Sequence, residues 1–477
     1  MTEPHRSPDT GLPRGVVARY AAGSLGTGGF ATLPGLVLVY YLTDSLGVAA
    51  LTAGLIVAVA KIWDVIIDPV IGGLSDRALA LRGSRRGPML LGAVGLPLAF
   101  VLTFAVPPGL GPWVSALWVL LAFVAAATFF SLFQVPYIAL PAELTDGYAE
   151  RTRLLTWRVV VLTLAILVFG AGGPEIRGLF PENLPLGYLV MAAAAAVLLG
   201  IGLWIGASVA PRSAGPGRLD PIPAAGSPAP PGAFSLAHYR QGFAVLRESQ
   251  PFRALLGAFM LQGLATGLML AGAQFVATWV LRDEGAVTVL FLALIAPALL
   301  FAPAWRWIAD RIGKERAFRL ASFAFLVATI ALVAMTWAPG WWIVAPVALA
   351  GAAYAGMQTL PMAMLPDVIS FHAARAPWGD GRAGVFGGMW TAGETLGMAL
   401  GSTVLTLVLA ITGYIESTAG VTVQQPASAV SGIALSFSLL PALLMLLSLV
   451  VLGRYRLREG DIAAGAPRDI ATSGAET

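Results

Sequence analysis

Cysteine is absent from the 477 residues of this chain, and there are only three histidines. The lack of thiols excludes a disulfide framework, a thiolate metal site and a cysteine nucleophile. Charge is also scarce, since Asp, Glu, Lys and Arg make up 11% of the residues, against 57% hydrophobic residues and a mean hydropathy of +0.80. So few polar side chains cannot cover water-soluble domains of this length, which excludes a soluble enzyme.

Motifs for enzymatic chemistry are missing as well. The sequence has no phosphate-binding loop, no nucleophile elbow and no zinc-binding helix pattern, so an ATP-driven pump or an intramembrane hydrolase has no chemistry to use. The histidines, His5, His238 and His372, fall in or near segments that we predict to be cytosolic. We therefore expect no enzyme, no cofactor and no metal site.

What the chain has in abundance is long apolar runs. A helix needs about 20 apolar residues to cross the roughly 30 Å hydrocarbon core of a bilayer. Six runs, a polar break and six more runs reach that length: 16–43, 50–75, 88–107, 113–141, 155–173, 186–209, 252–281, 286–308, 317–337, 341–366, 384–412 and 429–453. The sequence therefore predicts an all-α membrane protein with twelve transmembrane helices in two six-helix bundles.

These runs divide the chain into five parts: an N-terminal tail (1–15), a first bundle (16–209), a linker (210–250), a second bundle (251–453) and a C-terminal tail (454–477). The linker is rich in Pro, Gly and Ala and cannot bury enough apolar surface to fold alone. In its later part, the helical spacing of Phe234, Tyr239, Phe243 and Leu246 predicts a short helix at the membrane surface.

Lysine and arginine concentrate in the loops on one side of the predicted bundle. Twelve such residues lie on that side: Arg77, Arg82, Arg85, Arg86, Arg151, Arg153, Arg311, Lys314, Arg316, Arg454, Arg456 and Arg458. Only Arg177 and Arg282 fall on the other side. Because positive loops stay in the cytoplasm, we predict that both termini are cytoplasmic and that the protein lies in the cytoplasmic membrane. The basic charge is then explained by the lipid bilayer, not by a nucleic-acid partner.

An Asp-Arg pair follows the second helix of each predicted bundle. The pairs are Asp76-Arg77 and Asp310-Arg311, and they are separated by close to half of the chain, as duplicated halves require. This arrangement resembles the major facilitator superfamily. The resemblance implies that these four residues help to close the cytoplasmic side of a transporter. The alternative is that the loop arginines only set the topology.

The second predicted helix carries charges within its apolar run. Lys61, Asp64 and Asp68 stand at positions i, i+3 and i+7 and so share one helix face. Ionised carboxylates inside a bilayer are costly, and two of them repel each other, so a proton or a small cation between them would relieve the strain. Pro69 also frees the main-chain carbonyl of Val65. A Lys-Asp pair that only fixes helix packing would account for one of the two acids.

Three segments carry a more specific resemblance: AKIWDVIIDPVIGG (60–73), VPYIALPAELTDGYAERTRLLTWR (135–158) and, more loosely, 365–402. They are similar to the glycoside-pentoside-hexuronide:cation symporters, the melibiose permease group. The resemblance implies a cation between Asp64 and Asp68, with a hydroxyl from Ser131 and Lys61 as a neutralising charge. The family's asparagine ligand is replaced by Ile67. Because sodium needs several oxygen ligands and a proton needs one, we expect proton coupling, with sodium left open.

The family's sugar-binding residues are less well retained. Gly28 and Gln134 replace its acids, Ile138 and Gln358 replace its aromatic residues, and Thr395 replaces its lysine, whereas Arg158 is kept, so we do not expect a galactoside. The residues that we predict to line the substrate cavity instead are Gln134, Tyr137, Arg158, Gln262, Gln274, Gln358, Trp390 and Glu394. Amides and an indole can bind a polyol, although each glutamine could equally bond between helices.

Glu394 is a lone acid on a helix whose Gly393, Gly397 and Gly401 form a small-residue face for close helix contact. We expect it to be a second proton site or a partner of Lys61 or Arg158.

Together these features predict a monomeric, cation-coupled symporter that moves a small organic solute by alternating access. The family resemblance implies a sugar or a glycoside as the solute. A carrier of lysolipids or other amphiphiles with the same fold is one alternative. A non-transporting membrane assembly scaffold is the other, but a scaffold has no need for two acids on one face of a membrane helix.

Overall fold

The computed structural model describes residues 12–145, 148–211, 246–373, 383–419, 421, 423–455 and 457. Most of both tails and most of the linker, including Phe234, Tyr239 and Phe243, therefore lie outside the described residues, as do His5 and His238. Twelve helices of the described chain are long and apolar enough to cross a membrane. The predicted all-α architecture with twelve spans is confirmed.

The first six spans are single helices: α1 (Arg14–Asp44), α2 (Ala50–Arg82), α3 (Arg86–Phe104), α4 (Pro112–Leu144), α5 (Tyr148–Gly178) and α6 (Leu184–Ala207). Several of the next six are interrupted. They are α8 (Gln250–Phe275) with η1 (Val276–Val280), α9 (Ala286–Ile312), α10 (Lys314–Leu332) with η2 (Val333–Thr336), η3 (Trp341–Ile343) with α11 (Val344–Ala373), α12 (Ala383–Ile411), and α13 (Ala427–Phe437) with α14 (Leu439–Leu452).

Sequence chemistry explains where several helices end. α2 stops at Gly83, which has φ of 63°, and Gly313 after α9 has φ of 88°; both values are in the left-handed region that glycine adopts without strain. The same glycine stop therefore follows the second helix of both halves. The last span breaks at Ser438 because Pro441 has no amide hydrogen to donate to the carbonyl of Phe437 and its ring crowds that carbonyl.

The described residues fall into two compact units. The first takes its residues from Met1–Phe234, Ala271–Leu292 and Ser402–Val430, and the second from Ser235–Leu270, Ala293–Gly401 and Ser431–Thr477. The first unit therefore contains α1–α6 together with η1, the start of α9, the end of α12 and the segment after it. Each unit is described by itself below.

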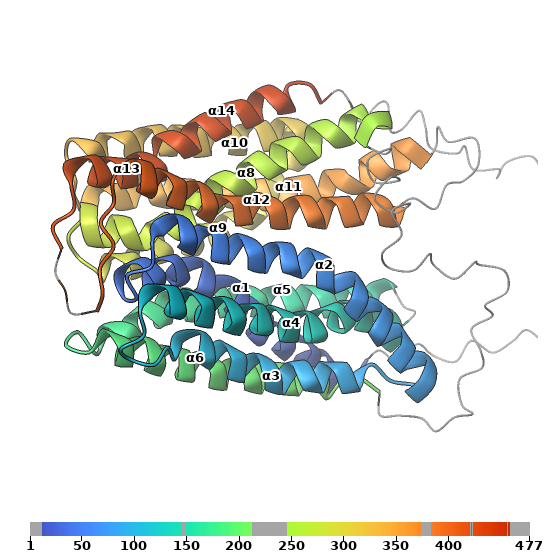
Figure 1. Ribbon diagram of the computed structural model, residues 1–477. Coiled ribbons are helices and arrows are strands. Elements are labelled where there is room, and N and C mark those ends of the chain that lie inside the picture. The colour runs from blue at the N-terminus through green and yellow to red at the C-terminus, as the bar shows by residue number, and fades with distance from the viewer. Residues whose placement is uncertain are drawn as a thin grey trace, which may run out of the picture. The chain divides into compact units, whose positions relative to one another are not determined.

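In the first unit, α1 is the central helix and packs against α5 and α6 (Figure 1). Glycines make this contact close. A Cβ at Gly28 would lie 2.9 Å from the main-chain oxygen of Leu162, and one at Gly206 would lie 2.7 Å from the Cα of Gly23. No side chain fits at Gly28. Gly28, where the resemblance implies a sugar-binding acid in the family, is therefore used here for helix packing.

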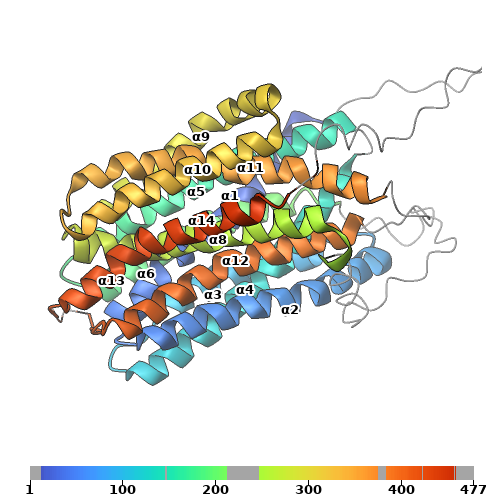
Figure 2. The same cartoon turned by 90° about the horizontal axis from the view of Figure 1, so that it is seen from above.

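Equivalent helices pack together in both halves. α3 contacts α4 and α6 in the first unit, and α10 contacts α11 and α14 in the second. Figure 2 shows α10 beside α11 and α3 beside α4. Each of these pairs joins the third helix of a half to its fourth and its sixth. The helix packing thus repeats, as the duplicated Asp-Arg motif predicts.

Candidate functional site

Asp64 and Asp68 lie on the side of α2 that faces away from its exposed apolar residues. Leu55, Ile62 and Ile66 form an apolar stripe on this helix and are 52%, 53% and 42% exposed. Because an α-helix turns about 100° per residue, Asp64 is rotated by about 200° and Asp68 by about 240° from Ile62. The two carboxylates therefore project away from the surface that the lipid tails would cover, toward the side on which α2 contacts α4.

Asp64 is only partly satisfied by its neighbours. Lys61 donates to its Oδ2 at 3.1 Å, and the carboxylate side chain is 14% exposed. The other oxygen, Oδ1, is buried and accepts no hydrogen bond from the described residues. A buried carboxylate oxygen without a donor is unfavourable, so this atom would be stabilised by a proton or by a small cation.

Asp68 follows one helical turn later and is more exposed than Asp64. The hydroxyl of Ser131 on α4 hydrogen-bonds its carboxylate, and both Asp64 and Lys61 act on it electrostatically. The four residues predicted for the cation site are thus brought together by α2 and α4. Cation binding at this site stays a prediction.

One contact in this region was missed in the sequence. The Trp63 indole donates to the hydroxyl of Thr128 on α4 at 2.9 Å. Thr128 stands one turn before Ser131, so this bond fixes the register in which Ser131 meets Asp68. The sequence could have indicated this contact, because the tryptophan in the I-W-D run has an indole N–H that needs a hydrogen-bond acceptor when it is buried.

The second unit contains a small pocket between α8, α11 and α12. Three of its residues, Gln262, Gln358 and Glu394, are among those predicted to bind substrate. The complete lining consists of Phe259, Gln262, Gly263, Thr266, Tyr354, Met357, Gln358, Glu394 and Met398. Sequence reasoning found the polar members that could act as ligands but missed Tyr354 and Thr266.

The two glutamines of this pocket also bond to neighbouring side chains. Gln262 donates to the hydroxyls of Ser322 on α10 at 2.9 Å and Ser448 on α14 at 3.0 Å. Gln358 donates to the Tyr354 hydroxyl at 2.5 Å. The Gln262 NH2 group thus forms hydrogen bonds between helices, which was the alternative to substrate binding. The carbonyl oxygen of the same side chain has no partner in the described chain.

The glycines beside Glu394 make the predicted close contact with α8. A Cβ at Gly397 would lie 2.8 Å from the main-chain oxygen of Met260, and one at Gly401 would lie 2.3 Å from the nitrogen of Leu268. On α8, a Cβ at Gly267 would lie 2.4 Å from the oxygen of Met398. The two backbones thus approach closely, which brings Glu394 and Thr266 to one pocket.

The remaining candidates lie in packed regions. Tyr137 is fully buried, stacks on Tyr20 at 4.7 Å and bonds to Ser24. Arg158 lies over the Tyr137 ring at 5.5 Å, and its Nε is buried without a partner among the described residues, as is Oε1 of Gln134.

Gln274 and Trp390 are also buried. Gln274 is fully buried and donates to Thr278. Trp390 is 2% exposed and stacks on Phe259 at 4.5 Å. Substrate roles for these residues and for Tyr137 remain predictions. Their burial means that they pack against neighbouring side chains.

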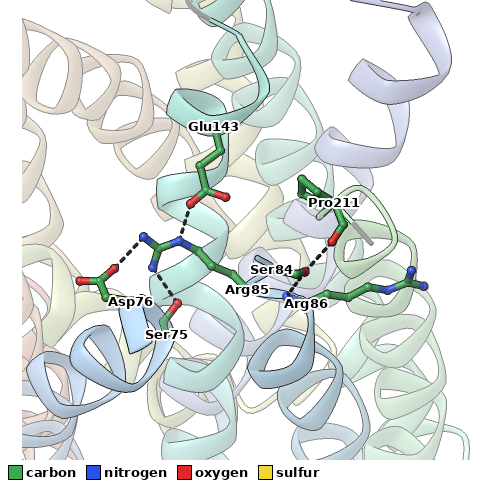
Figure 3. Close-up of polar contacts among 7 residues, drawn as sticks. All are labelled: Ser75, Asp76, Ser84, Arg85, Arg86, Glu143 and Pro211. Carbon is green, nitrogen blue, oxygen red and sulfur yellow. Dashed lines mark hydrogen bonds and ion pairs between the residues drawn. The ribbon is translucent and has the colours of Figure 1, made fainter. Parts of the chain in front are cut away.

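Figure 3 shows the predicted gating region of the first unit, where Arg85 is the central residue. Arg85 pairs with Asp76 at 2.6 Å, bonds to Ser75 at 2.8 Å, and forms an ion pair with Glu143 on α4. Burial alone would lower the pKa of the Arg85 guanidinium, but its bonds to the Glu143 and Asp76 carboxylates raise it above its ordinary value. The predicted Asp76 thus belongs to a charged cluster that ties α2, α3 and α4 together, whereas Arg77 is exposed.

The second unit has a matching ion pair. Lys314, which begins α10, bonds to Asp367 on α11 at 2.6 Å. Asp310 is exposed, and the guanidinium of Arg311 stacks over Trp307 at 3.6 Å. Both ion pairs thus lie near the predicted motifs, but the acids that pair with Arg85 and Lys314, Glu143 and Asp367, were missed in the sequence. Gating by these residues stays a prediction.

A repeat in the sequence could have revealed these two acids. Each follows two helix prolines that are five residues apart, at 136 and 141 in α4 and at 361 and 366 in α11.

A second polar cluster lies near the start of α2, about 40 Å from Asp76 by helix length. Asp44 is 6% exposed and accepts hydrogen bonds from Thr43 and Tyr414, each at 2.5 Å. Nearby, Arg177 is 2% exposed and pairs with Glu284 at 3.2 Å while donating to Tyr188. Sequence reasoning used Arg177 only for topology and missed Asp44, because this residue closes the first apolar run.

Among the described residues, no group of three or more His, Asp or Glu side chains gathers in a way that could hold a metal ion. The arrangement of Asp64, Asp68 and Ser131 supplies only a few oxygens, which suits a proton or a weakly held monovalent cation.

Comparison with known proteins gives a consistent picture. A family model described as MFS/sugar transport protein matches residues 19–459. An uncharacterized symporter of Synechocystis sp. is 26% identical, with 91% of this chain and 92% of that protein covered. The glucuronide carrier protein homolog of Escherichia coli is 25% identical over 93% of this chain and 92% of that protein.

A third relative acts on a different kind of molecule. The sodium-dependent lysophosphatidylcholine symporter 1 of Mus musculus is 25% identical, with 89% of this chain and 82% of that protein covered. A structure solved in a study of substrate recognition in proton-dependent oligopeptide transporters has a TM-score of 0.64 at 13% identity, covering 95% of this chain and 99% of that chain. The last similarity concerns the fold alone.

Proposed function

The chain belongs to the MFS/sugar transport family, and from that premise we propose that it is a cation-coupled symporter that moves a small organic solute by alternating access. It is a multi-pass membrane transporter with symporter relatives, and the resemblance to the melibiose permease group is confirmed at the level of the family. The cytoplasmic membrane as its location, cytoplasmic termini and a monomeric state belong to the proposal.

The observation that carries the proposal is the unpartnered Oδ1 of Asp64. Lys61 neutralises one charge of a pair of carboxylates, and the second carboxylate, Asp68, has a hydroxyl partner in Ser131. A cation or proton between the two acids would satisfy Oδ1 and reduce their repulsion. The loaded and unloaded carriers then differ in charge inside the membrane, which is the differential free energy that coupling requires.

A proton is the coupling ion that these residues favour. Sodium needs several oxygen ligands to replace its hydration shell, and the position before Asp68 is Ile67, whose side chain offers none. A proton needs one carboxylate oxygen. Sodium coupling is the alternative that the same acids support if main-chain carbonyls complete the site.

We propose a sugar or a glycoside as the solute. The relative from Escherichia coli is named as a glucuronide carrier homolog, and the pocket of the second unit offers the amide, hydroxyl and carboxylate groups that bind polyols.

An amphiphile is the second candidate. Phe259, Met357 and Met398 supply an apolar part of the same pocket, and a relative from Mus musculus is named as a lysophosphatidylcholine symporter. Flexible methionine side chains adapt to acyl chains more readily than to a sugar ring.

The test is uptake by proteoliposomes that contain the purified chain, with labelled methyl glucoside and lysophosphatidylcholine as probes. Uptake is driven either by a pH gradient or by a sodium gradient. The proposal expects gradient-dependent accumulation of one probe that is lost in Asp68→Asn and kept in Glu182→Gln, an exposed acid outside the site. Accumulation that ignores both gradients, or that survives Asp68→Asn unchanged, contradicts it.

A further inference from the structure

The amide and hydroxyl groups of the second-unit pocket present mainly hydrogen-bond acceptors. Both donor positions of the Gln262 amide are used by Ser322 and Ser448, so only its carbonyl oxygen is left, and that oxygen is buried without a partner among the described residues. A ligand that bonds to Gln262 must therefore bring a donor.

Two further residues of the lining, Thr266 and Gln358, also offer acceptors. Thr266 donates its hydroxyl hydrogen to the main-chain oxygens of Gln262 and Gly263, at 3.0 and 3.1 Å, so it offers lone pairs. Gln358 donates one of its two amide hydrogens to the Tyr354 hydroxyl, which leaves its carbonyl oxygen as an acceptor and its second amide hydrogen as a donor. Tyr354 offers a second donor, because its hydroxyl hydrogen remains available.

Glu394 adds a negative charge to these acceptors. It is half-buried, and none of the nine residues that line the pocket is a lysine, an arginine or a histidine. No ion pair is recorded for Glu394 within the described chain. A carboxylate in such a setting lacks the counter-ion that buried charges require.

We propose that this pocket holds a protonated amino group of the solute, with Glu394 as its counter-ion and the carbonyl oxygens of Gln262 and Gln358 as acceptors. An ammonium group has three donors and no acceptor, which complements one carboxylate and two carbonyl oxygens. The proposal rests on the proposed function, because it assumes that the pocket belongs to the solute path. It also implies that an anionic solute such as a uronide binds poorly, because Glu394 repels it.

The ammonium group could belong to an amino sugar or to the head group of a lysolipid. The experiment measures the thermal stability of the purified full chain in detergent with matched probes. D-glucosamine is compared with N-acetyl-D-glucosamine, which keeps the ring but lacks the charge, and with D-glucuronate. Lysophosphatidylethanolamine is compared with lysophosphatidylglycerol, which lacks the amine.

From the dependence of the unfolding temperature on probe concentration, we expect one amine probe to bind at least about tenfold more tightly than its uncharged or anionic counterpart. Glu394→Gln should remove this preference. The pair of probes that shows the effect identifies the source of the amine. Equal affinity for amine and amide probes, no binding of either amine, or a preference that survives Glu394→Gln would overturn the proposal. The probe comparison needs no variant, so it remains decisive if Glu394→Gln does not fold.

This outcome is separate from that of the proposed function. Loss of gradient-driven uptake in Asp68→Asn, together with no preference for amines, would leave the symporter proposal intact and reject only the amine. Binding of an amine without any response to either gradient would do the reverse.

Discussion

The Tyr414 hydroxyl donates to Oδ1 of Asp44 at 2.5 Å, although 370 residues separate the two in the sequence. Both residues belong to the first unit. The Trp279 indole in turn donates to the Tyr414 oxygen at 2.8 Å, so the end of α1 is linked to η1 and to the segment after α12. Any movement that separates α1 from these segments must break this buried network.

The first prediction concerns the hydroxyl of Tyr414. Tyr414→Phe should lower the free energy of unfolding by about 1.5–3 kcal/mol, because Asp44 and Trp279 both lose a partner in a buried site. Tyr20→Phe is the matched control, since the buried Tyr20 hydroxyl has no partner in the described structure and its removal should be neutral or stabilising. Thermal unfolding in detergent measures both, and equal effects of the two variants would contradict the prediction.

The second prediction concerns alkaline pH. Burial, and then the neighbouring Asp44 carboxylate, raise the pKa of Tyr414 above its ordinary value of 10.0. A raised pKa means that the folded chain holds this proton more tightly than the unfolded chain, so the stabilisation is complete below about pH 10 and declines above it. The unmodified chain should therefore lose stability more steeply than Tyr414→Phe in an unfolding series that extends above pH 10. Parallel curves would contradict this prediction.

The third prediction concerns the contact between α8 and α12. Gly397→Ala should destabilise the chain by about 1–3 kcal/mol, because the new Cβ would lie 2.8 Å from a main-chain oxygen that cannot easily move. Gly387→Ala on the same helix has open space around its Cβ and should raise stability by about 0.5–1 kcal/mol. The difference in unfolding temperature between the two variants is the measurement. Similar stability of both would show that the close approach is not needed.

The fourth prediction ranks the two acids that hold Arg85. The Arg85 side chain is 12% exposed, Glu143 is 20% exposed and Asp76 is 67% exposed. Glu143→Gln should therefore cost about 1.5–3 kcal/mol, whereas Asp76→Asn should cost at most about 1 kcal/mol and respond more strongly to salt. Unfolding in low and high salt tests the ranking, with Arg77→Gln, an exposed residue, as the control. A larger effect of Asp76→Asn would reverse our account of this cluster.

Much of the fold could be predicted because bilayer thickness, helix rise and the cost of charge in lipid leave few alternatives for a chain with this pattern. The same argument located Asp64 and Asp68, which are anomalies inside an apolar run. Residues whose partners lie far away in the sequence escaped it. Asp44 needs Tyr414, and the Gln262 amide needs Ser322 and Ser448, so their surroundings depend on which helices pack together, and hydropathy does not carry that information.

The break near the end of α8 was also not predictable from the sequence. The π-helical turn Val276–Val280 itself contains neither proline nor glycine, and we attribute it to tertiary packing. The division into compact units likewise joins η1 and parts of α9 and α12 to the first six helices. The predicted bundles, with boundaries at 209 and 251, follow the order of the chain, whereas the compact units follow its contacts. The bundle boundaries therefore stay a prediction.

The measurement that addresses the central proposal most directly is an infrared difference spectrum of the purified chain, titrated with protons and with sodium, because it needs no knowledge of the solute. We predict a carboxylate signal that disappears on protonation in the unmodified chain, is lost in Asp64→Asn and in Asp68→Asn, and is unchanged in Glu182→Gln. A signal that persists in full in both aspartate variants, or a spectrum that responds to neither ion, would contradict the claim that an ion binds between these two acids.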